Sequence, residues 1–361
     1  MAASPEAPKP KPRPFYGGQA VIEGVMMRGS AHFAVACRRA NGGIQVQEEP
    51  VPVFFTRFRW AKWPFLRGVF ALADALALGM KALSFSSNLA LEDERQRAAK
   101  TPTGPLTQAL LAPLLLIFAA VEEAPAPAKG RLTIANISIG ASAVFGLAAG
   151  LGLFLFVPNL IAFSPWVTAV LPGDLGRNLL EGFLRIGIVL GYIAAIGRMS
   201  AIQRVFQYHG AEHKAINALE KTGGLDIDAA AGASRIHPRC GTNFVLTVLM
   251  IKIIAFALLP VGHSVWLRLA YRLLLLPVVA AVAYEIIRLA GTYRRFKPLQ
   301  WLVLPGLLTQ KLTTREPDRS MLEVSLASLR AVLLSEGDER AGAPLTASAE
   351  PVAPSPAAAI A

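Results

Sequence analysis

The sequence predicts a mainly α-helical, polytopic membrane protein with four to six membrane helices, a small amino-terminal β-hairpin region and a cytoplasmic His-rich connection. Three observations predict this fold class. Of the 361 residues, 53% are hydrophobic and only 17% are charged, whereas a soluble domain carries about a quarter charged residues. Several apolar segments approach the roughly 20 residues that cross a bilayer. The net charge of +12 lies in short blocks beside these segments, which is typical of membrane proteins rather than nucleic-acid-binding proteins.

The two ends of the chain are expected to be disordered tails. Residues 1–14 are rich in Pro and lack the apolar core of a signal peptide, so they are not expected to be a cleaved signal. Residues 337–361 consist mainly of Ala, Pro, Ser and Thr. The two cysteines, Cys37 and Cys240, are too few for a disulfide framework, which favours a reducing environment for both.

A cytoplasmic β-rich segment is expected over residues 15–64. Residues 32–38 and 44–51 have strand character and flank Asn41-Gly42-Gly43, which accept the positive φ of a hairpin turn. The Gly-rich run 17–29 predicts a tight irregular path with Glu23 and Arg28 as semi-buried charges. One interpretation is an ion pair within the fold, and the alternative is that Glu23 or Arg28 faces the His cluster. Residues 54–67 interleave aromatic and basic side chains, as at a membrane interface.

Apolar segments of membrane length follow. Residues 65–132 predict amphipathic or weakly embedded helices, because residues 66–90 contain Asp74 and Lys81, and 106–121 is short and contains Pro113. Residues 133–292 form the main membrane region. Its four expected helices cover residues 143–163, 179–199, 244–262 and 269–291.

The distribution of basic residues predicts the orientation. The connections 198–242 and 292–315 hold many Lys and Arg, whereas 164–178 holds only Arg177. The positive-inside rule therefore places the two basic connections in the cytoplasm. Both termini are then cytoplasmic, provided that the two weaker segments both cross or both fail to cross.

A cytoplasmic carboxy-terminal segment is expected over residues 293–336. Ser320 and Glu323 have capping-box spacing and predict the start of an amphipathic helix. Its apolar stripe is expected to dock on the rest of the protein, on the bilayer or on a partner.

The connection 200–242, the motif loop of the membrane region, contains H-x-x-E-H at residues 209–213. On a helix, His209 and His213 lie on one face and can bind one divalent ion, with Zn²⁺ the expected metal, while Glu212 acts on the bound water. The alternative is an ordinary amphipathic helix whose Ala211, Ile216 and Leu219 pack inward. Gly210 allows another backbone to approach closely.

Two imidazoles leave a tetrahedral ion short of ligands. His237 and Cys240 offer an imidazole and a thiolate at the end of the same connection, and Glu285 is the downstream glutamate that zinc enzymes of this type use. A rival interpretation pairs Glu285 with Lys252 at similar depth in the neighbouring antiparallel helix. Glu181 and Arg185, four residues apart, are expected to form a local ion pair.

Four segments, GGQAVIEGVMMRG, YHGAEHKAINALE, HPRCGTNF and LTTREPD, together resemble the YqhQ family of bacterial multi-pass membrane proteins over about residues 15–335. That family is described as a predicted metal-dependent enzyme with no established reaction. The resemblance implies a fold bound to the bacterial cell (inner) membrane. The residues to which it points are Gly18, Gln19, Glu23, Gly24, Arg28, His209, Glu212, His213, His237, Arg239, Cys240, Thr313, Thr314 and Glu316.

The leading functional expectation is a metal-dependent hydrolase at the cytoplasmic membrane face. Its substrate would be a protein segment or a lipid-linked molecule presented by the membrane. The expected partners are this substrate and membrane lipid, and no nucleic acid is expected. An oligomer is compatible with the sequence. Candidate catalytic residues are Glu212, Arg239 and Glu23, and candidate metal ligands are His209, His213, His237, Glu285 and Cys240. One alternative is a non-enzymatic scaffold or assembly factor with a structural polar network. A transporter that uses Lys252 and Glu285 is another.

Overall fold

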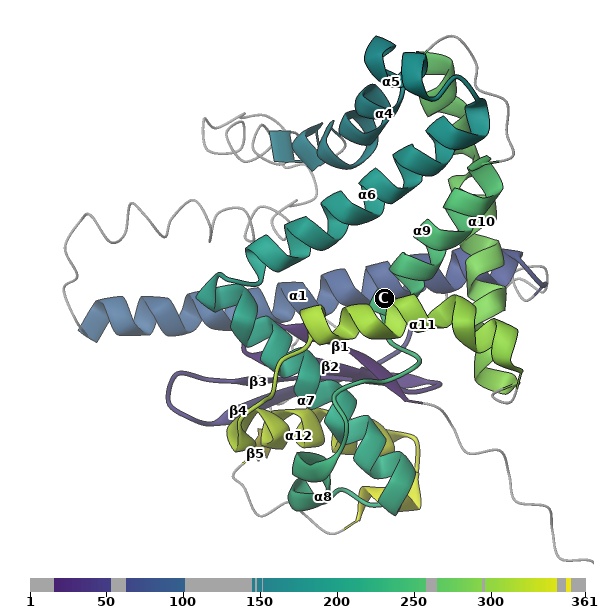
Figure 1. Ribbon diagram of the computed structural model, residues 1–361. Coiled ribbons are helices and arrows are strands. Elements are labelled where there is room, and N and C mark those ends of the chain that lie inside the picture. The colour runs from purple at the N-terminus through teal and green to yellow at the C-terminus, as the bar shows by residue number, and fades with distance from the viewer. Residues whose placement is uncertain are drawn as a thin grey trace, which may run out of the picture.

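The computed structural model describes residues 16–52, 63–100, 145–146, 148–150, 152–257, 265–293, 296–342 and 349–351. Figure 1 shows a β-sheet between helices at the base, with apolar helices rising away from it. The strands are β1 (Gly17–Val21), β2 (Gly24–Arg28), β3 (His32–Arg38), β4 (Ile44–Pro50) and β5 (Ala349–Pro351). The longer helices are α1 (Leu66–Lys100), α6 (Asp174–Ile196), α7 (Ser200–Thr222), α9 (Gly241–Ala257), α10 (Val265–Thr292), α11 (Lys297–Thr313) and α12 (Arg319–Ser335).

The sheet has the order β1-β2-β3-β4-β5, and only β5 pairs in parallel. The expected hairpin is confirmed: β3 pairs with β4, and Gly42 in the turn has φ of 89°. The irregular path predicted for residues 17–29 is wrong, because this run forms the hairpin β1–β2, with Glu23 at φ 51° in its turn. Part of the expected carboxy-terminal tail is also ordered, since residues 339–341 form a 3₁₀-helix and residues 349–351 form β5.

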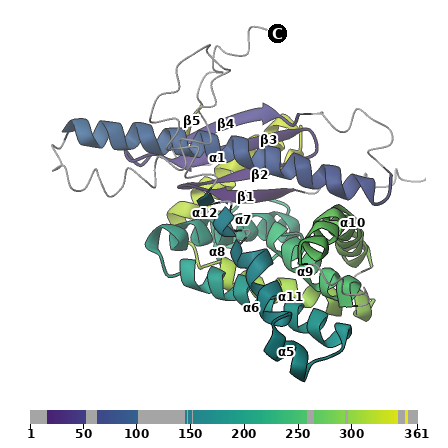
Figure 2. The same cartoon turned by 90° about the horizontal axis from the view of Figure 1, so that it is seen from above.

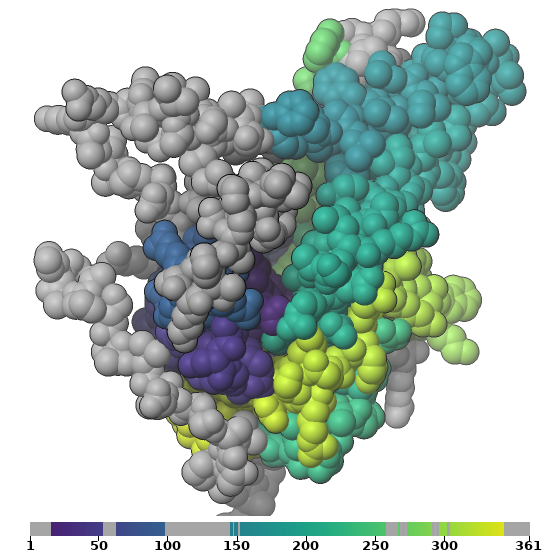
Figure 3. Space-filling view, turned by 90° about the vertical axis from the view of Figure 1, so that its left-hand side faces the viewer, coloured from purple at the N-terminus to yellow at the C-terminus, as the bar shows by residue number. Residues whose placement is uncertain are grey.

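Alternation along the strands gives the sheet two apolar faces. On one face, Val25 and Met27 of β2 pack with residues of α7 and α12 such as Ala211 and Leu329. On the other face, strand residues including Phe33 pack with one side of α1, which contributes Leu78, Ala82 and Leu89. The base of the molecule is therefore a helix–sheet–helix sandwich, in which the first strands and the last long helix share one core. Figure 3 shows amino-terminal and carboxy-terminal residues side by side on one surface below α6.

Three helical segments among the described residues are long and apolar enough to cross a membrane: Leu66–Arg97, Asp174–Ile196 and Leu273–Ala290. The described part of the chain thus has three of the four to six membrane helices expected. Residues 66–90 belong to a single helix of 35 residues and not to a weak segment. Helix α9 has only 17 residues. Figure 2 shows α6, α9, α10 and α11 grouped beside the β1 edge of the sheet.

Within the segment expected as a helix over 143–163, the described residues form a shorter apolar helix, Ala148–Ala162, that contains a π-helical turn. Residues 152–156 form a π-helical turn, η2, and Val157–Ala162 form the short helix α4, followed by α5 (Pro165–Val170). The expectations for residues 1–14, for 106–121 and for most of the interfacial segment 54–67 lie outside the described residues.

Helix α12 is confirmed, but its N-cap is Asp318 and not Ser320. The Asp318 carboxylate accepts a hydrogen bond from the backbone N–H of Met321 at 2.9 Å. The apolar stripe of α12 docks on the rest of the protein, which is one of the three possibilities considered. Its residues Leu326, Leu329 and Leu333 are buried in the core of the protein. Helix α11, inside the expected connection 292–315, was not predicted.

Candidate metal centre

Helix α7 places the two histidines of the H-x-x-E-H motif side by side, as predicted. The rings of His209 and His213 have centroids 4.5 Å apart. The chain following α11 crosses α7 at Gly210, where a Cβ atom would overlap the backbone oxygen of Arg315. The expected close approach of another backbone is therefore confirmed, and it brings the end of α11 to the histidines.

Backbone carbonyl groups fix the orientation of both imidazoles. His209 Nδ1 lies 2.9 Å from the oxygen of Thr313, and His213 Nδ1 lies 2.6 Å from the oxygen of Arg235. Because a carbonyl oxygen only accepts hydrogen bonds, both Nδ1 atoms must donate. In the neutral rings, Nε2 then carries the lone pair, as in metal-binding histidines whose other nitrogen is bonded to a carbonyl.

The thiol of Cys240 completes a group of three donor atoms. It lies 3.1 Å from His209 Nε2, and the ligand atoms of His209, His213 and Cys240 all lie within 4.8 Å of one another. His213 Nε2 is buried, and the His213 side chain contacts the same thiol. Two imidazole nitrogens and a thiolate suit Zn²⁺, and three protein ligands leave the fourth tetrahedral position open, as in catalytic sites. These residues therefore fit a zinc ion.

Glu212 lies beside this group on α7 and is only 4% exposed. Burial raises the pKa of its carboxyl group, against the opposing effects of His209, His237 and the backbone N–H of Gly18. Gly18 is required here because a Cβ at this position would overlap β2 and crowd the Glu212 side chain. Burial also lowers the pKa of His213, which keeps the ring neutral as metal binding requires.

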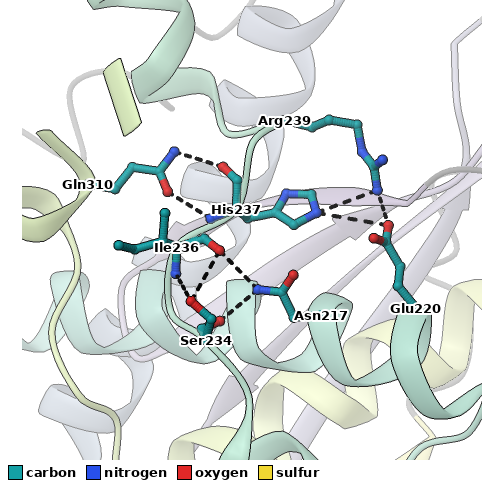
Figure 4. A network of polar contacts seen from close by, with 7 residues as sticks. All are labelled: Asn217, Glu220, Ser234, Ile236, His237, Arg239 and Gln310. Carbon is teal, nitrogen blue, oxygen red and sulfur yellow. Dashed lines mark hydrogen bonds and ion pairs between the residues drawn. The ribbon is translucent and has the colours of Figure 1, made fainter. Parts of the chain in front are cut away.

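His237 and Arg239 lie in a neighbouring polar network (Figure 4). Gln310 of α11 bonds both the backbone N–H and the carbonyl of His237, each at 2.8 Å. The His237 ring is 5.8 Å from that of His213, but its Nε2 lies 3.9 Å from Glu220. Arg239 donates to the same Glu220 carboxylate. His237 is thus near the three donor atoms without belonging to their group, and Arg239 points to Glu220.

Two expected site residues lie elsewhere. Glu285 accepts hydrogen bonds from the Arg67 guanidinium and, at 3.2 Å, from the backbone N–H of Phe65, so it belongs neither to the donor group nor to a pair with Lys252. The prediction of Glu285 as a ligand is corrected, because the start of α1 packs on α10 and supplies the counter-charge. Glu23 pairs with Arg204 at the start of α7, and Arg28 lies 3.9 Å from Asp74 of α1. The two charges are thus held within the fold by other partners and not by each other.

A family model described as "Protein of unknown function (DUF1385)" matches residues 63–335 of the chain. The chain belongs to this DUF1385 family. It is also 32% identical over 336 residues to the "Uncharacterized protein YqhQ" of Bacillus subtilis (strain 168), which covers 92% of this chain and 98% of that protein. The resemblance to the YqhQ family is thereby confirmed. No solved structure matches the chain.

The DUF1385 match includes all three donor residues and also the partners that sequence reasoning missed. The carbonyl groups of Thr313 and Arg235 orient the histidines, and Gln310 and Glu220 fix the connection around His237. The motif LTTREPD pointed to Thr313 as a residue, although its backbone oxygen is the functional atom. No side-chain signal marks a carbonyl acceptor, so Arg235 could not have been identified.

Proposed function

We propose that this protein is a metal-dependent membrane hydrolase with a zinc-type centre at His209, His213 and Cys240. One observation carries the proposal: both Nδ1 atoms donate to backbone carbonyl groups, so both Nε2 lone pairs remain beside one thiol, within 4.8 Å of one another. A fixed second shell of this kind orients metal ligands and selects the binding tautomer.

The residues around the centre suggest how hydrolysis would proceed. A divalent ion held there would polarise the substrate and lower the pKa of a water molecule. Glu212, whose pKa is raised by burial, is suited to accept a proton from this water molecule and return it to the leaving group. Glu220 holds Arg239 and His237 at the rim.

The neighbourhood of the centre supports a substrate presented by the membrane. Helix α11 ends at Thr313, the residue that orients His209. One side of α11 exposes a row of large apolar residues at helical spacing: Trp301, Leu304, Leu308 and Leu312. Such a stripe lies in the bilayer interface. The centre would then lie at the headgroup level on the cytoplasmic side of a bacterial inner membrane, within reach of a protein segment or a lipid-linked molecule.

Metal analysis of the purified full-length protein tests this proposal. The parent should contain about one zinc ion per chain, and the double variant His209→Ala, His213→Ala should contain almost none. His32→Ala is the matched control, because His32 lies on β3 with its ring 4.0 Å from Glu48, outside the donor group. Equal metal content in the parent and the double variant, or no metal in the parent, would contradict the proposal.

The contact between His209 Nε2 and Cys240 Sγ, at 3.1 Å, favours a second function, that of a thiol-dependent acyl transferase or hydrolase. A nucleophile bonded to a base that a third group orients is the arrangement of cysteine hydrolases. Here Cys240 would attack, His209 would take its proton, and the Thr313 carbonyl would hold the ring.

Alkylation with iodoacetamide distinguishes these two functions. Burial raises the pKa of the Cys37 thiol to about 12, so in the folded protein only Cys240 should react. With a metal centre, zinc should protect Cys240 and a chelator should restore its reaction. With a free nucleophile, Cys240 should react rapidly whether or not zinc is present.

The scaffold alternative is tested by Glu212→Gln. If the polar residues only hold the fold together, this variant should complement a deletion strain as well as the parent does, because Gln keeps its hydrogen bonds. Loss of complementation with normal folding and metal content favours the enzyme. The argument for a transporter is lost, because the pair between Lys252 and Glu285 does not form.

A further inference from the structure

The outer edge of the sheet, at β1, carries backbone groups that the sheet itself does not use. In the turn between β2 and β3, the N–H of Gly29 donates to the carbonyl of His32 at 2.9 Å. By the alternation of an antiparallel ladder, odd-numbered residues of β2 therefore bond β3 and even-numbered residues bond β1. Gly18 and Ala20 of β1 lie opposite odd-numbered residues of β2. Their N–H and C=O groups thus point away from the sheet.

The rest of the molecule uses only one of these outward groups. The N–H of Gly18 donates to the Glu212 carboxylate. Among the described residues, no hydrogen bond reaches the carbonyl of Gly18 or either backbone group of Ala20. Both residues are partly exposed. The edge therefore offers one donor and two acceptors in a row.

Strand β1 also lacks the features that normally protect an exposed edge. Charged side chains and Pro keep further strands from pairing with an edge, yet β1 reads Gly-Gly-Gln-Ala-Val and contains neither. At the opposite edge, β4 carries Glu48, Glu49 and Pro50 and is partly covered by β5. Another extended backbone has N–H and C=O groups that repeat with the spacing of a strand edge. The edge of β1 thus fits a polypeptide that adds a strand to the sheet.

The open edge lies beside the three donor atoms. Ala20 packs on the same core as Ala211 of α7. The Glu212 side chain occupies the space that a Cβ at Gly18 would crowd. Figure 2 shows α6, α9, α10 and α11 grouped on the outer side of β1. A strand added to β1 would therefore lie on the side of the sheet that faces these helices, next to Glu212.

We propose that β1 binds the substrate as an antiparallel strand, so that the substrate is an extended polypeptide segment. This inference rests on the hydrolase function proposed above and selects one of its two substrate classes. The substrate residue opposite Ala20 would exchange two backbone hydrogen bonds with it. The substrate residue opposite Gly18 would donate its N–H to the Gly18 carbonyl. Its own carbonyl has no donor on β1, because the Gly18 N–H is bonded to Glu212.

This unpaired carbonyl identifies the bond to be cleaved. It would lie beside Glu212 and the three donor atoms, where a divalent ion polarises a carbonyl group. Glu212 takes a proton from water, and the hydroxide adds to the carbonyl carbon. The C–N bond then breaks, and the proton passes from Glu212 to the leaving amine. The residue opposite Gly18 is therefore the first residue before the cleaved bond, and the residue opposite Ala20 is the third.

Peptides with a single N-methyl group test the pairing. The probe is the decapeptide that binds most tightly from a fluorescein-labelled library, measured by anisotropy with the full-length protein in detergent and with chelator present. An N-methyl group is then placed at each position in turn. Binding should weaken about tenfold at two positions, as for one lost hydrogen bond. The position between these two should tolerate the N-methyl group, because its N–H points away from β1. With zinc added, the unmodified probe should be cleaved directly after the second sensitive residue.

Ala20→Pro tests the pairing from the protein side. Pro removes only the outward N–H, and edge strands accept Pro where the N–H faces solvent. The variant should fold and bind the probe about tenfold less tightly. Glu48→Pro is the matched control, because Glu48 lies opposite Ala34 on β4, where the same alternation points its N–H outward from the other edge. It should bind the probe like the parent. If Ala20→Pro fails to fold, the N-methyl pattern decides, since it leaves the protein unchanged.

The outcomes separate this inference from the proposed function. Absence of any bound decapeptide, equal effects of N-methylation at adjacent positions, or unchanged binding by folded Ala20→Pro would overturn the strand pairing. If zinc-loaded protein hydrolyses a lipid-linked molecule and no peptide, the hydrolase stands and the polypeptide substrate is refuted. If the alternating pattern appears without hydrolysis in the presence of zinc, the strand pairing is supported and the hydrolase is refuted.

Discussion

The crossing at Gly210 gives the sharpest test of how the proposed metal centre is built. In Gly210→Ala, the new methyl group would overlap the backbone oxygen of Arg315. This backbone is held on both sides, because the Arg315 N–H donates to Phe206 at 2.9 Å and its guanidinium donates to Gly197 at 2.9 Å. The segment after α11 therefore has to move away from α7, and Thr313, two residues before Arg315, moves with it.

Two opposing effects set the expected change in the unfolding free energy of Gly210→Ala. Overpacking of a tight contact costs about 1–3 kcal/mol, whereas replacing Gly by Ala inside a helix gains about 1 kcal/mol. The control Gly191→Ala makes the same replacement within α6, where nothing lies within 4 Å of the new Cβ. Relative to this control, Gly210→Ala should lose about 1–3 kcal/mol of unfolding free energy. Displacement of the Thr313 carbonyl from His209 should weaken metal binding about 10–100-fold.

Thermal unfolding in detergent measures the first effect, and zinc titration with a competing chelator measures the second. Both losses should appear in Gly210→Ala and neither in Gly191→Ala. If Gly210→Ala is as stable as the control, the close approach of the Arg315 backbone is refuted. If it is destabilised but binds zinc as the parent does, the Thr313 carbonyl does not orient the metal ligand.

Three further predictions concern the burial of Glu212, the ion pair of Arg67 with Glu285, and the packing of α12. Because burial raises the pKa of the Glu212 carboxyl group, this group binds a proton more tightly in the folded chain than in the unfolded chain. Its contribution to the free energy of unfolding is complete below the pKa of the unfolded chain and is lost as the pH rises through the pKa of the folded chain. The stability of Glu212→Gln relative to the parent should therefore increase as the pH rises. Urea denaturation in the presence of a chelator measures this difference in unfolding free energy, and a difference that does not change with pH would refute the effect of burial. Arg67→Met should destabilise the protein more than the double variant Arg67→Met, Glu285→Met, by a coupling of about 1–3 kcal/mol in thermal unfolding, and additive losses would contradict the ion pair. Leu329→Ala, in the core, should cost about 2–5 kcal/mol, whereas Leu334→Ala, at an exposed position of the same helix, should cost almost nothing, and equal losses would contradict the docking of α12.

The sequence predicted those elements whose signal is local. The hairpin β3–β4 follows from strand patterns around a turn whose Gly42 has positive φ. The full length of α1 could not be recognised, because Asp74 and Lys81 interrupt its apolar pattern. The structure shows that these charges pair with Arg28 and Glu49 of the sheet, partners that no local pattern contains.

In the candidate site, too, the sequence predicts local features but not contacts between distant segments. The spacing of His209 and His213 sufficed to place both rings on one face of a helix. The meeting of Cys240 with His209 depends on the path of the connection, and Thr313 reaches His209 across 104 residues of sequence. Glu285 was misassigned because its partner Arg67 lies 218 residues away. Local spacing therefore predicts that the two histidines lie together, and tertiary packing determines which third donor atom lies beside them.

The choice between a metal centre and a purely structural polar network depends on how the hydrogen-bonding capacity of α7 is used. In a structural network, buried polar atoms are satisfied by protein or water. Here the Nδ1 atoms of His209 and His213 are satisfied by backbone carbonyl groups, whereas both Nε2 atoms share the thiol of Cys240. A thiol is only a weak hydrogen-bond partner for two buried imidazole nitrogens. The proposed cation between the three donors would bind all of them at once.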